Sequence, residues 1–308
     1  MELTIETKLT LNDGQRIPQL GLGVWQVRAG ATCEAAVLAA LEAGYRLIDT
    51  ASMYGNEENV GAAIRKSGIP RENIFVTTKL WNSDHGNPER ALDTSLRKLK
   101  MDYVDLYLIH YPVRERRQSW RALEALQAQG KARSIGVSNF TIRHLTDLLA
   151  QTKTVPAVNQ VEFHPYLYQR DLLDYCAGKG IVVEAYSPLT TGARLKEPKL
   201  VAVAKKYSTG EPQTARSRSR LPLLDRLLPP LRKANRQRKS SSAGRCSMAW
   251  WSFPNRPIAH ASSKMPMSST LKSPQRICVF STALMKTCEP AGIRPTRRER
   301  ELSERICH

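Results

Sequence analysis

The stretch from residue 45 to residue 110 decides the fold, because three short apolar runs alternate there with two helical patterns. The apolar runs are Tyr45–Thr50 (YRLIDT), Ile74–Lys79 (IFVTTK) and Val104–His110 (VDLYLIH). Nearly continuous apolar runs of this length are typical of strands that are buried on both faces of a parallel sheet. Between them, Asn59–Lys66 and Pro88–Leu99 carry apolar residues at helical spacing. The stretch therefore predicts three parallel strands joined by two helices.

The same alternation continues on both sides of this stretch. Further strands are expected at Gln19–Val24, Arg133–Val137, Ala157–Phe163 and Ile181–Tyr186, and further helices at Cys33–Ala43, Trp120–Gln129, Arg143–Leu149 and Arg170–Gly178. A β-hairpin is expected at Leu9–Ile17, because the Asp13-Gly14 pair tolerates the positive φ angles of a tight turn. Together the segments predict seven β/α units that follow an N-terminal hairpin.

Seven such units fit either a doubly wound open sheet or an α/β TIM barrel, (β/α)8, that lacks its last strand. A dinucleotide-binding open sheet needs a Gly-x-Gly-x-x-Gly turn after its first strand. Here Gly21 and Gly23 are present, but Gln26 stands where the third glycine or an alanine is required. The missing glycine favours the barrel.

Four polar residues occupy positions at which a barrel collects its functional groups. Asp49, Lys79 and His110 lie at or next to the C-terminal ends of three different predicted strands, and Tyr54 follows in the next loop. The C-terminal ends of the strands converge on one face of a barrel, where active sites form. Each residue alone also has a purely structural interpretation, such as a helix cap for the aspartate or a satisfied core residue for the histidine.

Taken together, the four residues form a set that can transfer a proton. A tyrosine is a poor acid at neutral pH, but the ammonium group of Lys79 stabilises the phenolate and is expected to move the pKa of Tyr54 toward the working range. Asp49 would keep the lysine charged and oriented. His110 could donate a hydrogen bond to a substrate carbonyl while Tyr54 delivers the proton.

Seven motifs extend across nearly all of residues 1–207 in one fixed order, and they carry a family resemblance. They are QLGLGVWQ, GYRLIDTASMYGNEENVG, TTKLWN, DYVDLYLIHYP, KARSIGVSNF, NQVEFHPY and EAYSPL. The sequence resembles the aldo-keto reductase superfamily, and most closely its bacterial 2,5-diketo-D-gluconate reductase type. The resemblance implies a barrel that binds NADPH, with NADH not excluded, across its C-terminal face.

The resemblance also implies a role for each matching residue. Tyr54 becomes the general acid of a catalytic tetrad that Asp49, Lys79 and His110 complete. The cofactor-binding residues implied are Ser138, Asn139 and Gln160 for the nicotinamide carboxamide, Tyr186 for ring stacking, and Ser187 and Leu189 for the pyrophosphate. The substrate pocket would be walled by Trp25, Trp81 and Tyr111; for the two tryptophans, packing at the barrel rim is the alternative. Because the loop Pro112–Gln118 is short and polar, small hydrophilic carbonyl compounds are the expected substrates.

The last third of the chain has a different composition. The 308-residue chain carries a net charge of +19; residues 1–207 contribute 27 basic and 22 acidic side chains, whereas residues 208–308 contribute 20 and 6. All ten tyrosines lie at or before Tyr207. We therefore predict a reductase barrel over residues 1–207 and a basic segment over 208–308. A nucleic-acid-binding tail, a disordered extension and translation in the wrong frame are the three explanations of this segment.

Codon degeneracy favours the third explanation. When the codons of Cys246–Arg256 are shifted to begin at each third base, they permit QHGVVVIPKS, which resembles the missing eighth strand of the family. In the same frame, residues 233–246 permit the preceding helix and residues 260–272 permit a stretch with the arginine and asparagine of the adenosine site. We therefore hypothesise a frameshift. As written, the chain would lack the last strand and the C-terminal helices, and the first and seventh strands would have unpaired edges.

Two functions follow as alternatives. The first is NAD(P)H-dependent reduction of aldehydes or ketones, weakened in this chain by its incomplete cofactor site. The second is a non-catalytic truncated barrel whose basic tail binds polyanions non-specifically.

The cysteines show no metal-ligand spacing, the N-terminus lacks the features of a signal peptide, and no run is apolar enough to span a membrane. We expect no metal, no membrane, no specific nucleic-acid partner, a cytoplasmic location and, as is common in the family, a monomer.

Overall fold

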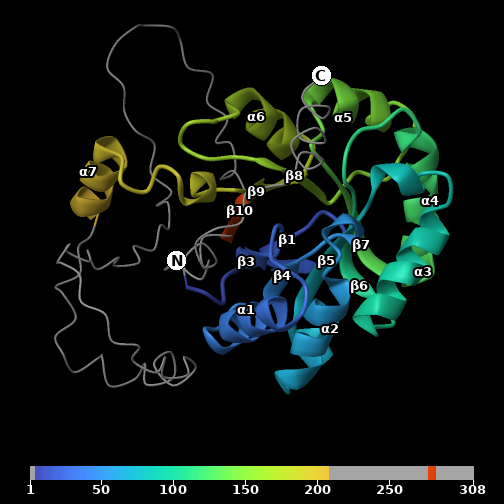
Figure 1. Ribbon diagram of the computed structural model, residues 1–308. Helices are drawn as coiled ribbons and strands as arrows, with labels where there is room; N and C mark the ends of the chain where they lie inside the picture. Colours follow the sequence, from blue (N-terminus) through green and yellow to red (C-terminus); the bar gives the residue numbers. More distant parts are fainter. Residues whose placement is uncertain (1–3, 208–276, 282–308) are drawn as a thin grey trace, which may run out of the picture. The chain divides into compact units, whose positions relative to one another are not determined.

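Eight parallel strands form a closed barrel in the computed structural model, which describes residues 4–207 and 277–281 (Figure 1). The strands pair in the order β10-β3-β4-β5-β6-β7-β8-β9. Helices α1 to α6 lie outside the ring of strands. The predicted (β/α)8 barrel is therefore confirmed.

The barrel strands are β3 (Leu20–Gly23), β4 (Leu47–Asp49), β5 (Phe75–Leu80), β6 (Val104–Ile109), β7 (Ala132–Ser138), β8 (Val158–Glu162), β9 (Val182–Tyr186) and β10 (Ile277–Ser281). The helices outside them are α1 (Ala31–Glu42), α2 (Glu57–Lys66), α3 (Pro88–Leu99), α4 (Arg116–Ala128), α5 (Ile142–Leu149) and α6 (Arg170–Gly178). Short 3-10 helices occur at Ser52–Tyr54, Arg71–Asn73, Asn82–Asp84 and Thr190–Gly192.

The helices begin where the local sequence supplies capping groups. Asn87 accepts a hydrogen bond from the backbone N–H of Arg90, and Pro88 follows at the first turn of α3, where a missing N–H has no cost. Thr141 and His144 form a reciprocal capping box at the start of α5. The same strands and helices predicted from apolar spacing are present, with boundaries that differ by a few residues.

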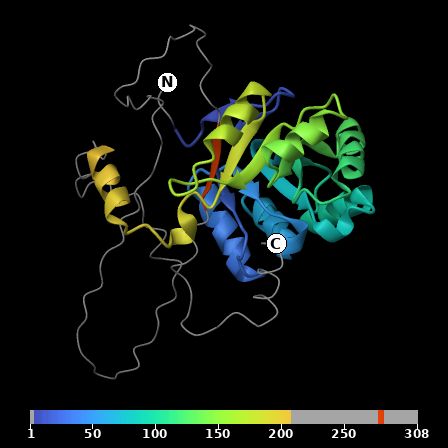
Figure 2. The same ribbon diagram turned by 90° about the horizontal axis from the view of Figure 1, so that it is seen from above.

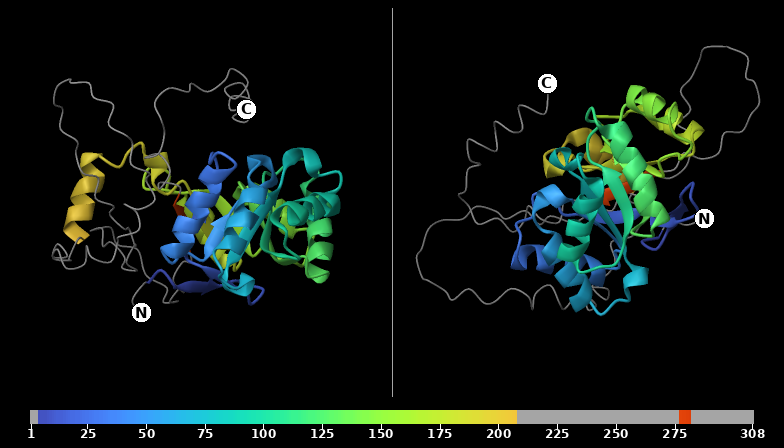
Figure 3. Two further views of the ribbon diagram at one scale, coloured as in Figure 1. Left: turned by 60° about the horizontal axis from the view of Figure 1, so that its bottom comes forward. Right: turned by 90° about the vertical axis from the view of Figure 1, so that its right-hand side faces the viewer.

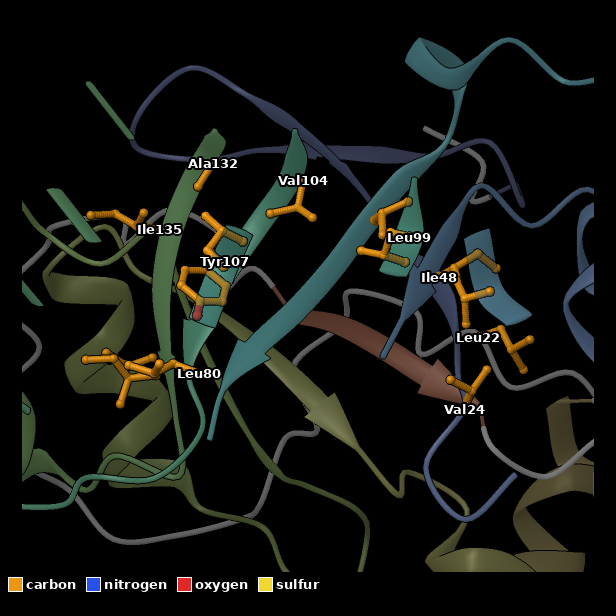
Figure 4. Packing of buried hydrophobic residues seen from close by; sticks show 14 of the residues in the cluster. Leu22, Val24, Ile48, Leu80, Leu99, Val104, Tyr107, Ala132 and Ile135 are labelled. Atoms are coloured by element: carbon orange, nitrogen blue, oxygen red, sulfur yellow. The ribbon is translucent and has the colours of Figure 1, made fainter. Parts of the chain in front are cut away.

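Alternate residues of the strands belong to two different buried clusters. The inner cluster comprises Leu11, Ile17, Leu47, Phe75, Leu106, Leu108, Ala157, Val158 and Val182. The outer cluster lies between strands and helices and includes Ile48, Val76, Tyr107, Ile135, Val161 and Val183; part of it is shown in Figure 4. Because successive side chains point to opposite faces of a strand, the residues two or four places beyond the inner ones also point into the barrel. This register places Asp49, Lys79, His110, Gln160 and Glu184 inside it.

The predicted N-terminal hairpin consists of β1 (Lys8–Thr10) and β2 (Arg16–Pro18), which pair antiparallel around Gly14 at a φ of 87°. Figure 3 shows the dark-blue hairpin at one end of the barrel. Its residues Leu11 and Ile17 belong to the inner cluster. The hairpin therefore closes the end of the barrel opposite to the C-terminal ends of the strands.

Strand β10 corrects our expectation that the barrel has open edges. Its backbone pairs in parallel with β9, where Cys278 lies opposite Glu184, and with β3, where Phe280 lies opposite Gly21. In Figure 2 the red β10 runs beside the yellow β9. The closing strand comes from residues 277–281 rather than from the segment directly after Tyr207. Unpaired edges on the first and seventh strands were therefore a wrong prediction.

Helix α7 (Pro198–Tyr207) belongs to a second compact unit, residues 194–265, of which only the part up to residue 207 is described. The shifted-frame segments 233–246, 246–256 and 260–272 lie outside the described residues, so the frameshift and the division at residue 207 stay predictions. None of the helices in the described ranges is long and apolar enough to cross a membrane.

Candidate active site

Asp49, Tyr54 and Lys79 meet at the C-terminal end of the barrel. Asp49 ends β4, Lys79 is the fifth residue of β5, and Tyr54 ends the 3-10 turn that follows β4. The Nζ atom of Lys79 donates hydrogen bonds to Oδ1 of Asp49 at 2.6 Å, to the Thr50 carbonyl oxygen at 2.9 Å and to the Tyr54 hydroxyl at 3.3 Å. An ammonium group has three donor hydrogens, so these three acceptors fix its position.

The ionisation of this cluster follows from its burial and its charges. Burial raises the pKa of Tyr54 to about 12, although the charge of Lys79 opposes this effect. Burial also disfavours the charged form of Lys79, but Asp49 and Tyr54 outweigh it and raise the pKa of Lys79. Our expectation of a lowered pKa for Tyr54 is therefore corrected, because desolvation exceeds the attraction of the ammonium group. Tyr54 is a neutral phenol that holds its proton.

His110 follows β6 and packs among aromatic rings. Its ring centroid lies 5.8 Å from that of Tyr54 in an edge-on arrangement and 5.1 Å from that of Tyr111, on which it stacks. Burial, together with the charge of Lys79, lowers the pKa of His110 to about 2. The imidazole is therefore neutral, and its buried Nδ1 atom has no hydrogen-bond partner in the part of the chain that the structure describes.

Two of the three predicted pocket residues belong to the same aromatic group. Trp81 lies edge-on to His110 at 5.1 Å and to Tyr111 at 6.1 Å, measured between ring centroids. Trp25 is 43% exposed on the turn after β3. Among the described residues it shows no ring contact with this group. The structure brings Trp81 and Tyr111 together with the tetrad and leaves Trp25 on a neighbouring loop.

The residues implied for the nicotinamide form a hydrogen-bonded series across β7, β8 and β9. Ser138 donates to the Gln160 backbone oxygen at 2.9 Å, and the Asn139 amide donates to Ser138 Oγ at 3.1 Å. The Tyr186 hydroxyl donates to Oδ1 of Asn139 at 3.0 Å. The side-chain amide of Asn139 also donates to the His110 carbonyl oxygen at 3.0 Å. Four of the implied cofactor residues are thus brought together and joined to the tetrad.

The two implied pyrophosphate residues lie just beyond β9. Ser187 is buried and has a φ of 49°, which is the left-handed region that residues with a Cβ rarely adopt. Its carbonyl oxygen accepts a hydrogen bond from the Thr190 N–H at 2.8 Å, which makes a tight turn. Leu189 is partly buried on this turn. The turn places both residues next to Tyr186 at the same end of the barrel.

Asn56 supports the Tyr54 loop and was missed by the sequence analysis. Its buried side chain accepts from the Thr50 hydroxyl at 2.8 Å and donates to the carbonyl oxygens of Val24 at 2.9 Å and Val27 at 3.2 Å. It therefore ties the loop that carries Tyr54 to the turn that carries Trp25. An asparagine in a polar loop gives no signal of burial, so only its place in the GYRLIDTASMYGNEENVG motif could have identified it.

Two further buried polar residues reach the tetrad from the far side of the barrel. The Gln160 amide donates to Oδ2 of Asp49 at 3.0 Å, a second role beyond the one implied. Glu184 on β9 is fully buried and was not predicted. No group of three or more His, Cys, Asp or Glu side chains within the described ranges is arranged to hold a metal ion.

Comparison with known proteins identifies the family that the chain resembles. The model of the Aldo/keto reductase family matches residues 19–285. The chain is 53% identical over 205 residues to an aldo-keto reductase of Mycolicibacterium smegmatis, covering 65% of this chain and 74% of that protein. It is 46% identical over 211 residues to glyoxal reductase of Bacillus subtilis, and the match covers 68% of this chain and 76% of that protein.

The solved structures agree with this assignment. An aldo-keto reductase of Bombyx mori in complex with NADP superposes with a TM-score of 0.62 at 37% identity, covering 67% of this chain and 77% of that one. The diketo-gluconate type is not singled out by these matches and stays a prediction. The match of the family model over most of the chain, together with the barrel and the cluster at its mouth, shows that the chain belongs to the aldo/keto reductase family.

Proposed function

We propose that this chain reduces aldehydes or ketones to alcohols with NADPH, and that Tyr54 is the general acid. The observation that carries the proposal is the 3.3 Å contact between the Tyr54 hydroxyl and the Lys79 ammonium group, which in turn pairs with Asp49. A phenol beside a fixed positive charge can give its proton to a developing alkoxide because the ammonium stabilises the phenolate that remains.

Each member of the tetrad has a separate task in this proposal. Tyr54 donates the proton. Lys79 stabilises the resulting phenolate, and Asp49 keeps Lys79 charged inside the barrel. His110, neutral because its pKa is about 2, orients the carbonyl oxygen as a hydrogen-bond donor rather than as an acid. The edge-on contact between His110 and Tyr54 supports their sharing one substrate oxygen.

The residues at the barrel mouth fit a nicotinamide cofactor. Ser138, Asn139 and Gln160 supply a hydroxyl group and two amide groups, which match the donor and acceptor of a carboxamide. The partly exposed ring of Tyr186 offers a flat surface for the nicotinamide ring. The cofactor would supply the hydride that reduces the carbonyl carbon. The NADP complex of the Bombyx mori protein supports NADPH as the cofactor, and NADH is the alternative.

Small polar carbonyl compounds are the proposed substrates. Trp81 and Tyr111 give the mouth an aromatic wall beside His110. The related glyoxal reductase of Bacillus subtilis is named for a small dicarbonyl, which supports this class. We propose that the chain acts as a cytoplasmic monomer, with diketo-gluconate-like compounds as one group of substrates to test.

The part of the proposed site that would bind the adenosine end of the cofactor is incomplete. The motif expected to hold it is absent from the sequence beyond Tyr207, so we expect a high KM for NADPH. Residues 208–308, with 20 basic and 6 acidic side chains, support the second candidate function, non-specific binding of polyanions.

One experiment separates the two functions. NADPH is titrated into the full chain while its fluorescence is followed, and glyoxal or methylglyoxal is then added to measure NADPH consumption. The reductase predicts a saturable fluorescence change that Tyr186→Ala weakens and a carbonyl-dependent loss of NADPH. Retention of DNA that falls steeply with salt, with no saturable NADPH signal, would reject the reductase in favour of polyanion binding.

A further inference from the structure

Glu184 is a carboxyl group enclosed in the barrel without a positive partner of its own. It is 0% exposed, and neither carboxyl oxygen has a hydrogen-bond partner among the described residues. Among the described residues, no lysine, arginine or histidine forms an ion pair with it. The lysine of the described ranges that acts on it electrostatically, Lys79, is already paired with Asp49 at 2.6 Å. Among the described residues, Asp49 is therefore paired with a lysine inside the barrel, whereas Glu184 is not.

The neighbours of Glu184 explain the protonation state of its carboxyl group. Gln160 lies directly opposite it on β8 and interacts with its carboxyl group, while on the other side β10 places Cys278 opposite it in the backbone register. The charged groups that act on it are Asp49 from β4 and Lys79 from β5. Burial, followed by the negative charge of Asp49, raises the pKa of Glu184 well above its usual value; Lys79 and the Gln160 amide oppose this shift but do not cancel it. A buried carboxyl group in this situation takes up a proton rather than remain an uncompensated charge.

The Gln160 amide connects this carboxyl group to the tetrad. Its Nε2 atom carries two hydrogens, of which one is donated to Oδ2 of Asp49 at 3.0 Å. The second is available to the carboxyl oxygen of Glu184. The amide therefore lies between a charged and an uncharged carboxyl group.

We propose that Glu184 is a positioning residue: as a protonated carboxylic acid it holds the Gln160 amide toward Asp49, and it leaves Asp49 as the single negative charge beside Lys79. The inference rests on the proposed function, because Gln160 is also one of the residues proposed to bind the nicotinamide. An ionised Glu184 would add a second negative charge and make the phenolate of Tyr54 harder to form.

Two variants separate the protonated state from a merely structural role. Glu184→Gln keeps the shape and the carbonyl acceptor but never carries charge. If Glu184 is protonated, this variant keeps kcat, the KM for NADPH and the pH profile of kcat/KM within about twofold of the wild type. Glu184→Met removes the carboxyl group that interacts with the Gln160 amide, so the KM for NADPH is expected to rise about tenfold, with a smaller change in kcat.

Infrared spectroscopy tests the protonation state without relying on activity. The full chain at neutral pH is expected to show a carbonyl band of a protonated carboxylic acid that disappears in Glu184→Gln. The matched control is Glu57→Gln, which changes another buried glutamate, hydrogen-bonded to Thr78 outside the barrel at 2.8 Å. This control is expected to keep the band.

The outcomes are distinct. Loss of the band in Glu184→Gln together with an unchanged pH profile supports the proposal. Absence of the band in the wild type, or a shifted pH profile in Glu184→Gln, overturns it, because either result means that Glu184 is ionised. If the chain shows no reductase activity at all, the proposed function fails while the infrared difference still decides the state of Glu184. If Glu184→Met does not fold, the Gln variant and the band are sufficient for the decision.

Discussion

Gln160 and Asp49 are separated by 111 positions in the sequence, yet the Nε2 atom of Gln160 donates a hydrogen bond to Oδ2 of Asp49 at 3.0 Å. The amide extends from β8 and the carboxylate from β4, so the contact crosses the inside of the barrel. A residue implied for cofactor binding and a residue implied for catalysis therefore belong to one hydrogen-bond network. A substitution at either residue is therefore expected to alter the function of the other.

Gln160→Leu tests this coupling. The variant removes the donor to Asp49 Oδ2, which leaves a buried carboxylate oxygen unsatisfied at a cost of about 1–3 kcal/mol. We expect both a higher KM for NADPH and a lower kcat, because the amide serves both groups. Steady-state kinetics checks this. A change in KM alone would mean that Gln160 does not support the tetrad.

Lys79→Met tests the ion pair. The variant leaves Asp49 charged and buried without its partner, which is expected to lower the free energy of unfolding by about 3–5 kcal/mol. The double variant Asp49→Asn with Lys79→Met removes both charges and should recover most of this stability, but not the activity. Urea unfolding monitored by circular dichroism measures all three proteins. Equal stability of the single and double variants would contradict a paired charge.

The depressed pKa of His110 predicts how stability depends on pH. In the folded chain its pKa is about 2, against an ordinary value of 6.5, so between these values the unfolded state binds the proton and the folded state does not. The stability contributed by neutral His110 is therefore full above pH 6.5 and is lost as the pH falls, by up to about 1.4 kcal/mol per pH unit.

The control for this prediction is His110→Asn, an uncharged replacement that cannot titrate. The free energy of unfolding of the wild type, measured from pH 7 downward, should fall more steeply than that of the variant. Because burial also lowers the pKa of His85, the variant keeps part of the slope. Identical slopes for the two proteins would show that His110 is not held neutral by the fold.

Gly136→Ala tests the packing beneath the site. A Cβ atom at Gly136 on β7 would lie 2.7 Å from the Val158 carbonyl oxygen and 2.8 Å from Cδ2 of Leu108. We expect a loss of about 1–3 kcal/mol of stability from overpacking. Gly86→Ala is the matched control, since a Cβ there meets nothing within 4 Å. Thermal unfolding compares the two variants. Equal melting temperatures would show that the backbone and side chains around Gly136 shift to accommodate the added methyl group.

The barrel and the line of its inner residues could be predicted from the sequence. Asp49, Lys79 and His110 end apolar runs, and the period of two along a strand is a local property that the sequence shows directly. Tyr54 lies in a loop, where no such period exists, so its role was inferred from its position after the Asp49 strand, the chemistry of the set and the family motif. The partnerships of Gln160 and Glu184 depend on which strands face each other across the barrel, which no local pattern reveals.

Two expectations failed for physical reasons. The pKa of Tyr54 is raised rather than lowered, because the sequence shows the neighbouring charge but not the burial that outweighs it. The closing strand Ile277–Ser281 lies far from the seventh strand in sequence. Its few residues give a weak strand signal in a basic segment, so the closure was not foreseen.

The central claim is that Tyr54 supplies the proton, and Tyr54→Phe tests it most directly. NADPH is bound to the wild type and to the variant, its binding is confirmed by fluorescence, and its single-turnover oxidation by methylglyoxal is then followed. We predict that the variant binds NADPH as the wild type does but oxidises it at least about 100-fold more slowly, the usual loss when a general acid is removed. Oxidation at the wild-type rate by Tyr54→Phe would contradict the account.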